Sequence, residues 1–229
     1  MDWAKDIFPF ENRMVPTRFV RRIWRTPSSR TPNMISIANP TWSIVFEQKS
    51  SGAKSVFLHG PETVATTVDI PQEAEYFGIE FELGAFAPSL AMAELTDNSL
   101  SLLILSDRSC VLFGDTVEIP TFDNADVFIN RLVRNGLLVG EDTIEQALLR
   151  QPVALTDRSI QRRFMAATGL TYGTIRQLDR AERAADLLGR GTPILDVVET
   201  EGFSDQPHLT RSVKKFLGKT PGEILPTIR

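Results

Sequence analysis

The sequence is poor in the residue types that build disulfides, metal centres and common catalytic sites. Its 229 residues include one cysteine, Cys110, so no disulfide can form within the chain. There are only two histidines, His59 and His208, far apart in the sequence. A histidine-rich metal centre, a Ser–His–Asp set and a glycine-rich phosphate loop are therefore not expected. We expect no enzyme: no catalytic residue, no metal and no cofactor.

Long hydrophobic runs are missing as well. No apolar run approaches the ~20 residues of a membrane-spanning helix. The first six residues lack the charged-then-apolar layout of a signal peptide. A lone cysteine within the apolar run 109–113 fits a buried packing residue in a reducing compartment. We therefore expect a cytoplasmic protein with no membrane partner.

The chain has no excess of positive charge. It holds 25 basic and 29 acidic residues, a net charge of −4. Residues 1–140 carry −5 and residues 141–229 carry +1, which is a weak electrostatic footprint for a DNA-binding protein. The placement of the basic residues therefore matters more than their sum. From charge alone, solvated helix faces and a DNA-binding surface remain equally open.

The first 34 residues are rich in arginine and contain four prolines, a spacing that no helix would survive. This composition predicts an arm with at most one short strand. Its cluster of Arg18, Arg21, Arg22 and Arg25 could contact DNA or an acidic protein surface, although a solvated face is the stronger alternative.

Residues 34–119 have the composition of β-structure, with short runs rich in Val, Ile, Thr and Phe between turn residues. Strands are predicted at 41–47, 54–59, 63–70 and 76–83, and residues 87–105 are predicted to be partly helical. This spacing indicates a small barrel or sandwich. Several aromatic residues could line an apolar effector pocket, although a filled core is the favoured alternative. They are Trp42, Phe46, Phe57, Tyr76, Phe77 and Phe81.

From residue 123 onward the pattern is helical. Helices are predicted at 123–135, 141–150, 156–168, 172–188, 193–201 and 204–217, followed by a short last helix capped by Thr220. Thr156 and Ser204 are expected as N-caps, and Gly169 and Gly218 as stops.

Two pairs of these helices have the layout of helix-turn-helix units. In the second pair, 193–201 supports 204–217 across a turn in which Gly202 supplies a positive φ. A hydrophobic set is expected in the core: Leu195, Val198, Phe203, Leu209, Val213 and Phe216. Gln206, Thr210 and Arg211 remain on the outer face, where arginine suits guanine and glutamine suits adenine. Ser204 and the helix N-terminus can contact a phosphate.

The first pair repeats this layout with 141–150 as support and 151–155 as the turn. Its second helix buries Ile160 and Phe164 and presents Arg158, Gln161 and Arg162. The turn has Ala154 where glycine would be more comfortable, which makes this unit the weaker of the two. The helix 172–188 joins the pairs as a rod of roughly 25 Å at about 1.5 Å per residue. With the flanking turns, the reading helices come near the ~34 Å of one duplex turn.

This arrangement resembles the AraC/XylS family of bacterial transcription regulators over about residues 123–229. The segments 180–188, 193–198, 202–211 and 216–221 carry the resemblance. By position, it implies base-reading roles for six residues: Arg158, Gln161 and Arg162, and Gln206, Pro207 and Arg211. Pro207 has no donor, so its contact would be apolar or steric. Lys214 and Lys215 are either backbone contacts or a plain basic face.

The predicted fold class is therefore a two-domain α+β protein. Residues 1–120 form a mainly-β, cupin-like barrel or sandwich that senses a ligand or dimerises, as the resemblance implies. Residues 123–229 form an all-α, double helix-turn-helix domain that binds two major-groove half-sites of double-stranded DNA.

Three functional hypotheses stay open. The first is a regulator that responds to a small-molecule effector. The second is a regulator whose N-terminal domain only forms a homodimer or contacts RNA polymerase. The third is an interaction module that does not bind DNA.

Overall fold

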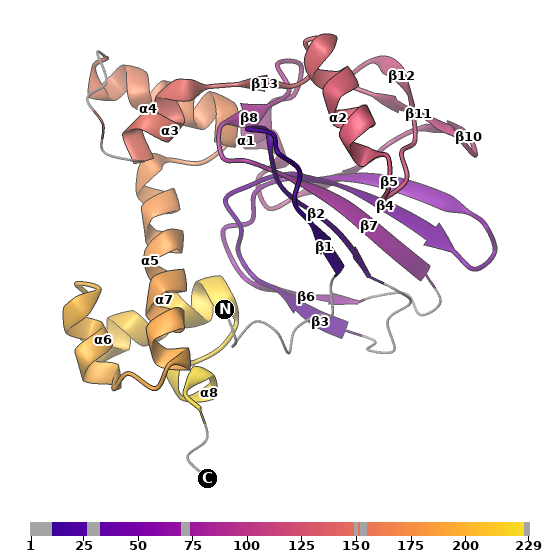
Figure 1. Ribbon diagram of the computed structural model, residues 1–229. Helices are drawn as coiled ribbons and strands as arrows, with labels where there is room; N and C mark the ends of the chain where they lie inside the picture. The colour runs from indigo at the N-terminus through magenta and orange to yellow at the C-terminus, as the bar shows by residue number, and fades with distance from the viewer. Residues whose placement is uncertain (1–10, 27–32, 70–73, 149–150, 152–154, 227–229) are drawn as a thin grey trace.

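The computed structural model describes residues 11–26, 33–69, 74–148, 151 and 155–226. These residues form a β-rich N-terminal part and a helical C-terminal part (Figure 1), which confirms the predicted two-domain α+β class. The strands are β1 Glu11–Arg13, β2 Val20–Thr26, β3 Asn33–Ser36, β4 Ser43–Lys49, β5 Lys54–His59, β6 Thr66–Asp69, β7 Ala74–Phe81, β8 Ala85–Phe86, β9 Ser99–Ser101, β10 Ile104–Ser106, β11 Ser109–Leu112, β12 Asp115–Glu118 and β13 Val139–Gly140. The helices are α1 Met92–Leu95, α2 Ala125–Arg134, α3 Asp142–Leu148, α4 Asp157–Thr168, α5 Tyr172–Gly189, α6 Ile194–Thr200, α7 Gln206–Leu217 and α8 Pro221–Ile224.

A six-stranded antiparallel sheet organises the β-rich part, with the strand order β1-β2-β7-β4-β5-β9. The four predicted strands are found as β4, β5, β6 and β7. One face of the sheet is apolar, because alternate residues of each strand point to the same side. Ile23, Ile44 and Ile79 lie opposite one another there and are fully buried. This face packs against α2 and the small sheet β10-β11-β12 to form the first hydrophobic core.

The N-terminal segment differs from the predicted arm. Residues 11–13 and 20–26 are strands β1 and β2, and β2 pairs with β7 inside the main sheet. The four arginines of this segment, for which a solvated face was the favoured alternative, form ion pairs within the chain. Arg22 and Arg21 pair with the buried Glu80, Arg18 with Asp142, and Arg25 with Glu11. This segment is therefore part of the β-structure. The ion pairs of its arginines agree better with a solvated face than with a DNA-contact cluster.

The helix α2 belongs by its packing to the β-rich part. Its residues Phe128, Ile129 and Leu132 are buried in the first core. By its packing α2 lies in the first core, and the second core takes in Ile144 and also Ala38 of the β-rich part, so the division at residue 123 stays a prediction. Helical periodicity placed α2 with the other helices, but a helix pattern does not specify which core the helix covers.

The helical part has its own core. Eight residues of α5 and its neighbours that are fully or almost fully buried illustrate it: Phe164, Leu178, Ala181, Ala184, Ala185, Leu188, Leu209 and Val213. Its helix ends match the sequence signals closely. The Thr156 side chain accepts a hydrogen bond from the Ser159 amide, and Gly169 ends α4 with a φ of 71°. Thr220 forms a capping box with Glu223 at the start of α8.

The two parts touch at both ends of the helical domain. At one end, the amides of Ala38 and Ala65 donate to the carbonyls of Phe216 and Lys215, at 2.7 and 2.8 Å. These carbonyls belong to the last turn of α7, where helix carbonyls lack intrahelical partners. At the other end, the Thr96 hydroxyl donates to the Gly169 carbonyl at 3.2 Å. The β-rich part therefore contacts the C-terminal ends of both α4 and α7.

Candidate nucleic-acid interface

The second helix-turn-helix unit consists of α6, a tight turn and α7. Gly202 has a φ of 67°, as predicted for the turn. Phe203 is buried behind it, and its ring contacts His208 edge-on with 5.2 Å between centroids. Leu209, Val213 and Phe216 bury the inner face of α7 against α5. Four of the six residues predicted for this core are fully buried, and Val198 is half-buried.

Two local predictions for this unit were wrong. Leu195 was placed in the core but is 68% exposed. Ser204 was predicted as the N-cap, whereas the cap is Asp205, whose carboxylate accepts from the His208 amide at 2.6 Å. The Ser204 hydroxyl instead bonds the His208 ring at 3.1 Å. An aspartate two residues before a proline, at the start of a helix, was a signal for this cap that the sequence analysis missed.

The first unit consists of α3 and α4, with the predicted turn partly outside the described residues, Ala154 included. An ion pair braces it: one Arg163 nitrogen lies 2.9 Å from both carboxylate oxygens of Glu141. Burial acts to raise the pKa of Glu141, but hydrogen bonds from Thr143 and Arg163 and the charge of Arg163 outweigh it and hold that pKa below its ordinary value. Arg163 is therefore engaged within the fold by Glu141.

The predicted reading residues lie on the outer faces of α4 and α7. On α4, Arg158, Gln161 and Arg162 are exposed at i, i+3 and i+4, opposite the fully buried Phe164. On α7, the exposed residues are Gln206, Pro207, Arg211, Lys214 and Lys215. Each helix thus has an apolar inner face and a polar outer face that carries arginine and glutamine. Such a face can donate to base edges and to phosphates.

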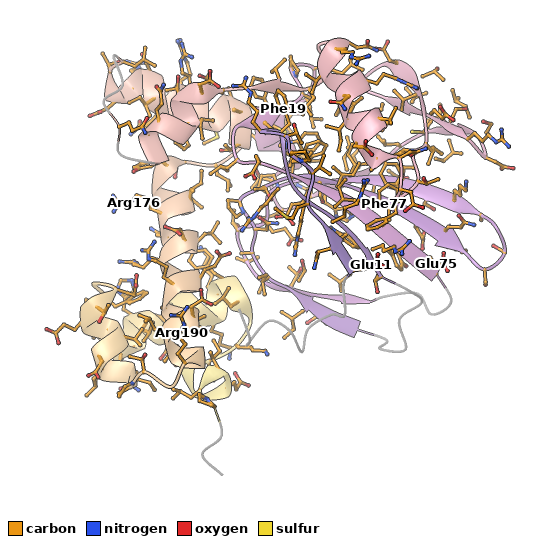
Figure 2. The ribbon with its side chains drawn as sticks, viewed as in Figure 1. Glu11, Phe19, Glu75, Phe77, Arg176 and Arg190 are labelled. Carbon is orange, nitrogen blue, oxygen red and sulfur yellow. The ribbon has the colours of Figure 1, made fainter. Side chains whose placement is uncertain are left out.

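The helix α5 joins the two units. Its 18 residues span roughly 27 Å at about 1.5 Å per residue, close to the predicted rod. The ribbon shows α4 near one end of α5 and α7 near the other (Figure 1). The Arg176 side chain lies on the side of α5 turned away from the β-rich part (Figure 2). None of the predicted DNA-contact residues lies on the linker helix.

The basic residues of the helical part fall into two groups. Arg163 and Arg183 are engaged by Glu141, and by Asp179 and Glu201. By contrast, no ion pair joins the exposed basic residues of α4 and α7 to a carboxylate among the described residues. The outer faces of α4 and α7 thus carry basic side chains without a carboxylate partner among the described residues, and Arg176 and Arg180 of α5 likewise form no such ion pair there.

The six aromatic residues named as candidates for an effector pocket do not share one surface. Trp42, Phe46 and Phe81 are packed in the first core, where the rings of Trp42 and Phe81 stack with centroids 3.9 Å apart. By the alternation along β5 and β7, Phe57 and Tyr76 lie on the opposite face of the sheet. The six residues therefore do not line one pocket, and the filled core accounts for Trp42, Phe46 and Phe81, with Phe77 packed against it.

The described residues hold no group of three or more His, Cys, Asp or Glu side chains arranged to bind a metal ion. Of the helices that the structure describes, none is long and apolar enough to cross a membrane.

The fold and this surface define a double helix-turn-helix domain. Residues 151–226 match a protein family described as a helix-turn-helix domain. This domain is of the AraC type, so the resemblance to AraC/XylS regulators is confirmed for the C-terminal part of the chain. Residues 17–101 match a family described as a domain of unknown function (DUF6597).

Two curated relatives match the C-terminal part. The HTH-type transcriptional regulator RipA of Corynebacterium diphtheriae is 40% identical over 70 residues, 31% of this chain and 21% of RipA. The regulatory protein ada of Salmonella typhimurium is 34% identical over 84 residues, 37% of this chain and 24% of that protein. The match thus spans about a fifth to a quarter of their length. Among solved structures, ToxT from Vibrio cholerae is 9% identical, with a TM-score of 0.41 over 93% of this chain and 97% of ToxT.

Proposed function

We propose that this protein is a sequence-specific, DNA-binding transcription regulator. One observation carries the proposal: a single domain presents two exposed helix faces with unpaired arginine and glutamine side chains, one on each helix-turn-helix unit. The helix α5, roughly 27 Å long, joins the two units, and we expect it to place the two faces near one duplex turn apart. The relatives of this domain are named as regulators, which supports the same function.

Selection of bound sequences from a random duplex pool tests the proposal. We expect two half-sites about one helical turn, roughly 10 base pairs, apart, both bound by one protomer. Binding to random duplex should also weaken steeply with salt, because it releases counterions from the DNA backbone. A protein that shows no salt-dependent binding to any duplex is the interaction module of the third hypothesis.

We also propose that the β-rich part controls DNA binding. It contacts the ends of both α4 and α7, so a change in its conformation is transmitted to both units. A small-molecule effector is one source of such a change, and a homodimer or RNA polymerase is another. A thermal-shift screen against metabolite pools separates them, since only an effector raises the melting temperature of the isolated protein at a fixed concentration.

A further inference from the structure

A basic hollow lies between the linker helix and the second reading helix, beside the base-reading residues. Its volume is about 210 Å³. The lining residues are Gln177 and Arg180 of α5, and His208, Arg211, Ser212, Lys215 and Phe216 of α7. The hollow thus joins α5 to α7: Arg211 is shared with the predicted base-reading set, whereas Gln177 and Arg180 lie on the linker helix.

The charge of the lining residues favours an anion in the hollow. Arg180, Arg211 and Lys215 contribute three cations, and none of the seven lining residues is acidic. No carboxylate among the described residues forms an ion pair with any of these three. The glutamine amide, the serine hydroxyl and the histidine ring add hydrogen-bonding groups that suit phosphate oxygens.

Two of the cations are held in place by aromatic rings. The Arg180 guanidinium lies 4.4 Å from the centroid of the Phe203 ring and donates to the Gly202 carbonyl at 3.4 Å. The Lys215 ammonium lies 4.7 Å from the centroid of the Phe216 ring. Contacts over a ring restrain long, flexible side chains. The entropy cost of ordering the side chains when an anion binds is correspondingly smaller.

We propose that this hollow binds one phosphate of the DNA backbone, in the stretch between the two major-groove segments. The proposal rests on the DNA-binding function proposed above. When two helices enter successive major grooves on one face of a duplex, the minor groove between them faces the protein. The phosphates that border it then approach the side of α5 that carries Arg176, seen in Figure 2. One phosphate held between Arg180 and Lys215 ties the reading helix to the linker helix without reading sequence.

Two variants that change the charge of the hollow in opposite directions test the site. Lys215→Gln removes a cation but keeps the main-chain bond to Ala65. Gln177→Lys adds a cation to the exposed side of α5. Arg131→Gln, on the exposed face of α2 in the β-rich part, is the matched control. Melting temperatures of all three variants check that the fold is kept.

Affinity is measured for random duplex and for the selected operator across a salt series. Each phosphate contact contributes about 0.9 to the slope of log K against log salt concentration. We expect Lys215→Gln to lower the slope by about that amount and to weaken binding by the same factor on both duplexes. Gln177→Lys should strengthen binding to random duplex, and Arg131→Gln should match the wild type.

Neutral methylphosphonate linkages, placed one at a time between the half-sites, locate the phosphate. We expect one linkage to weaken the wild type but not Lys215→Gln. If the wild type binds duplex with a normal salt slope and both hollow variants behave like it, the site proposal is overturned while the DNA-binding function stands. A wild type that binds no duplex overturns the function itself.

Inorganic pyrophosphate serves as the probe for a free ligand. If it raises the melting temperature of the wild type but not of Lys215→Gln, and the salt slopes are equal, the hollow belongs to a free phosphorylated molecule. That result also overturns the assignment to DNA.

Discussion

At the scale of single residues, Arg211 and Lys214 test the difference between a contact with a base edge and a contact with the DNA backbone. Both are exposed on α7, one turn apart along the same outer face. Arg211→Ala should weaken binding to the selected operator by about 1–3 kcal/mol, because arginine pairs with a guanine edge. Lys214→Ala should weaken operator and random duplex alike, as expected for a backbone contact. Competition binding with both duplexes separates the two roles, and an unchanged operator affinity for Arg211→Ala removes it from the reading set.

The N-cap of α7 gives a stability prediction. Asp205 accepts from the His208 amide, so Asp205→Ala leaves that amide without its partner and should cost roughly 1 kcal/mol of unfolding free energy. Ser204→Ala is the matched control, because the Ser204 hydroxyl bonds the His208 ring rather than a helix amide. Urea unfolding of the three proteins measures the difference. Equal losses for the two variants would contradict the assignment of the cap.

Predictions of burial from the sequence were correct for residues whose exposure follows from helical periodicity alone. Phe164 and Arg162 follow helical periodicity, and their opposite exposure was predicted correctly. Leu195 was predicted wrongly because its apolar type does not reveal that α6 turns this position to the solvent. The choice between Ser204 and Asp205 as cap depended on a one-residue difference in where the helix begins.

At the scale of elements, the end of α7 is where the two parts of the molecule meet. A Cβ on Gly218 would lie 2.8 Å from the Ile35 side chain and 3.3 Å from that of Ala65. Gly202 has a similar positive φ but has nothing within 4 Å. Both Gly218→Ala and Gly202→Ala should pay the backbone cost of about 1–2 kcal/mol, but only Gly218→Ala also forces the β-rich part away from α7.

Thermal unfolding and limited proteolysis measure that difference. We expect Gly218→Ala to lower the melting temperature further than Gly202→Ala and to expose the segment 33–39 to cleavage. Identical behaviour of the two variants would show that the contact contributes nothing to stability.

Helix bounds were easier to predict from the sequence than strand pairing. The helices α4, α5 and α7 were predicted to within two residues at each end, because N-caps and C-terminal glycines are recognisable from a few neighbouring residues. The strand β2 was not placed, because the proline-containing, arginine-rich segment 1–34 indicated an arm with one short strand at most. Its place in the sheet depends on pairing with β7, whose partner residues lie 50 to 61 positions further along the chain.

At the scale of the whole molecule, Glu182 on α5 lies among charges from both parts. Burial raises its pKa, Arg21 lowers it, and Asp179, Asp186 and Glu80 raise it further, so the pKa lies above its ordinary value of 4.5. A carboxyl whose pKa is raised by folding contributes stability below its unfolded pKa, and this contribution is lost as the pH rises through the folded pKa.

Glu182→Gln therefore tests this arrangement. The variant should gain stability relative to the wild type as the pH rises from about 4.5, and the gain should level off above the folded pKa. Urea unfolding across a pH series measures the two free energies. A difference between them that does not change with pH would contradict the raised pKa.

The sequence alone determined the helical half of this protein, because helix caps, glycine stops and the 3.6-residue period act over a few residues. It therefore predicted both helix-turn-helix units and the exposed faces that carry Arg158 and Arg211. Only the tertiary structure decided the rest: that residues 20–26 complete the main sheet, that α2 belongs to the first core, and that Trp42 and Phe57 lie on opposite faces. It also decided that the β-rich part contacts both reading helices and that Arg180 and Lys215 share one hollow. These features depend on contacts between segments far apart in the chain, which no local pattern specifies.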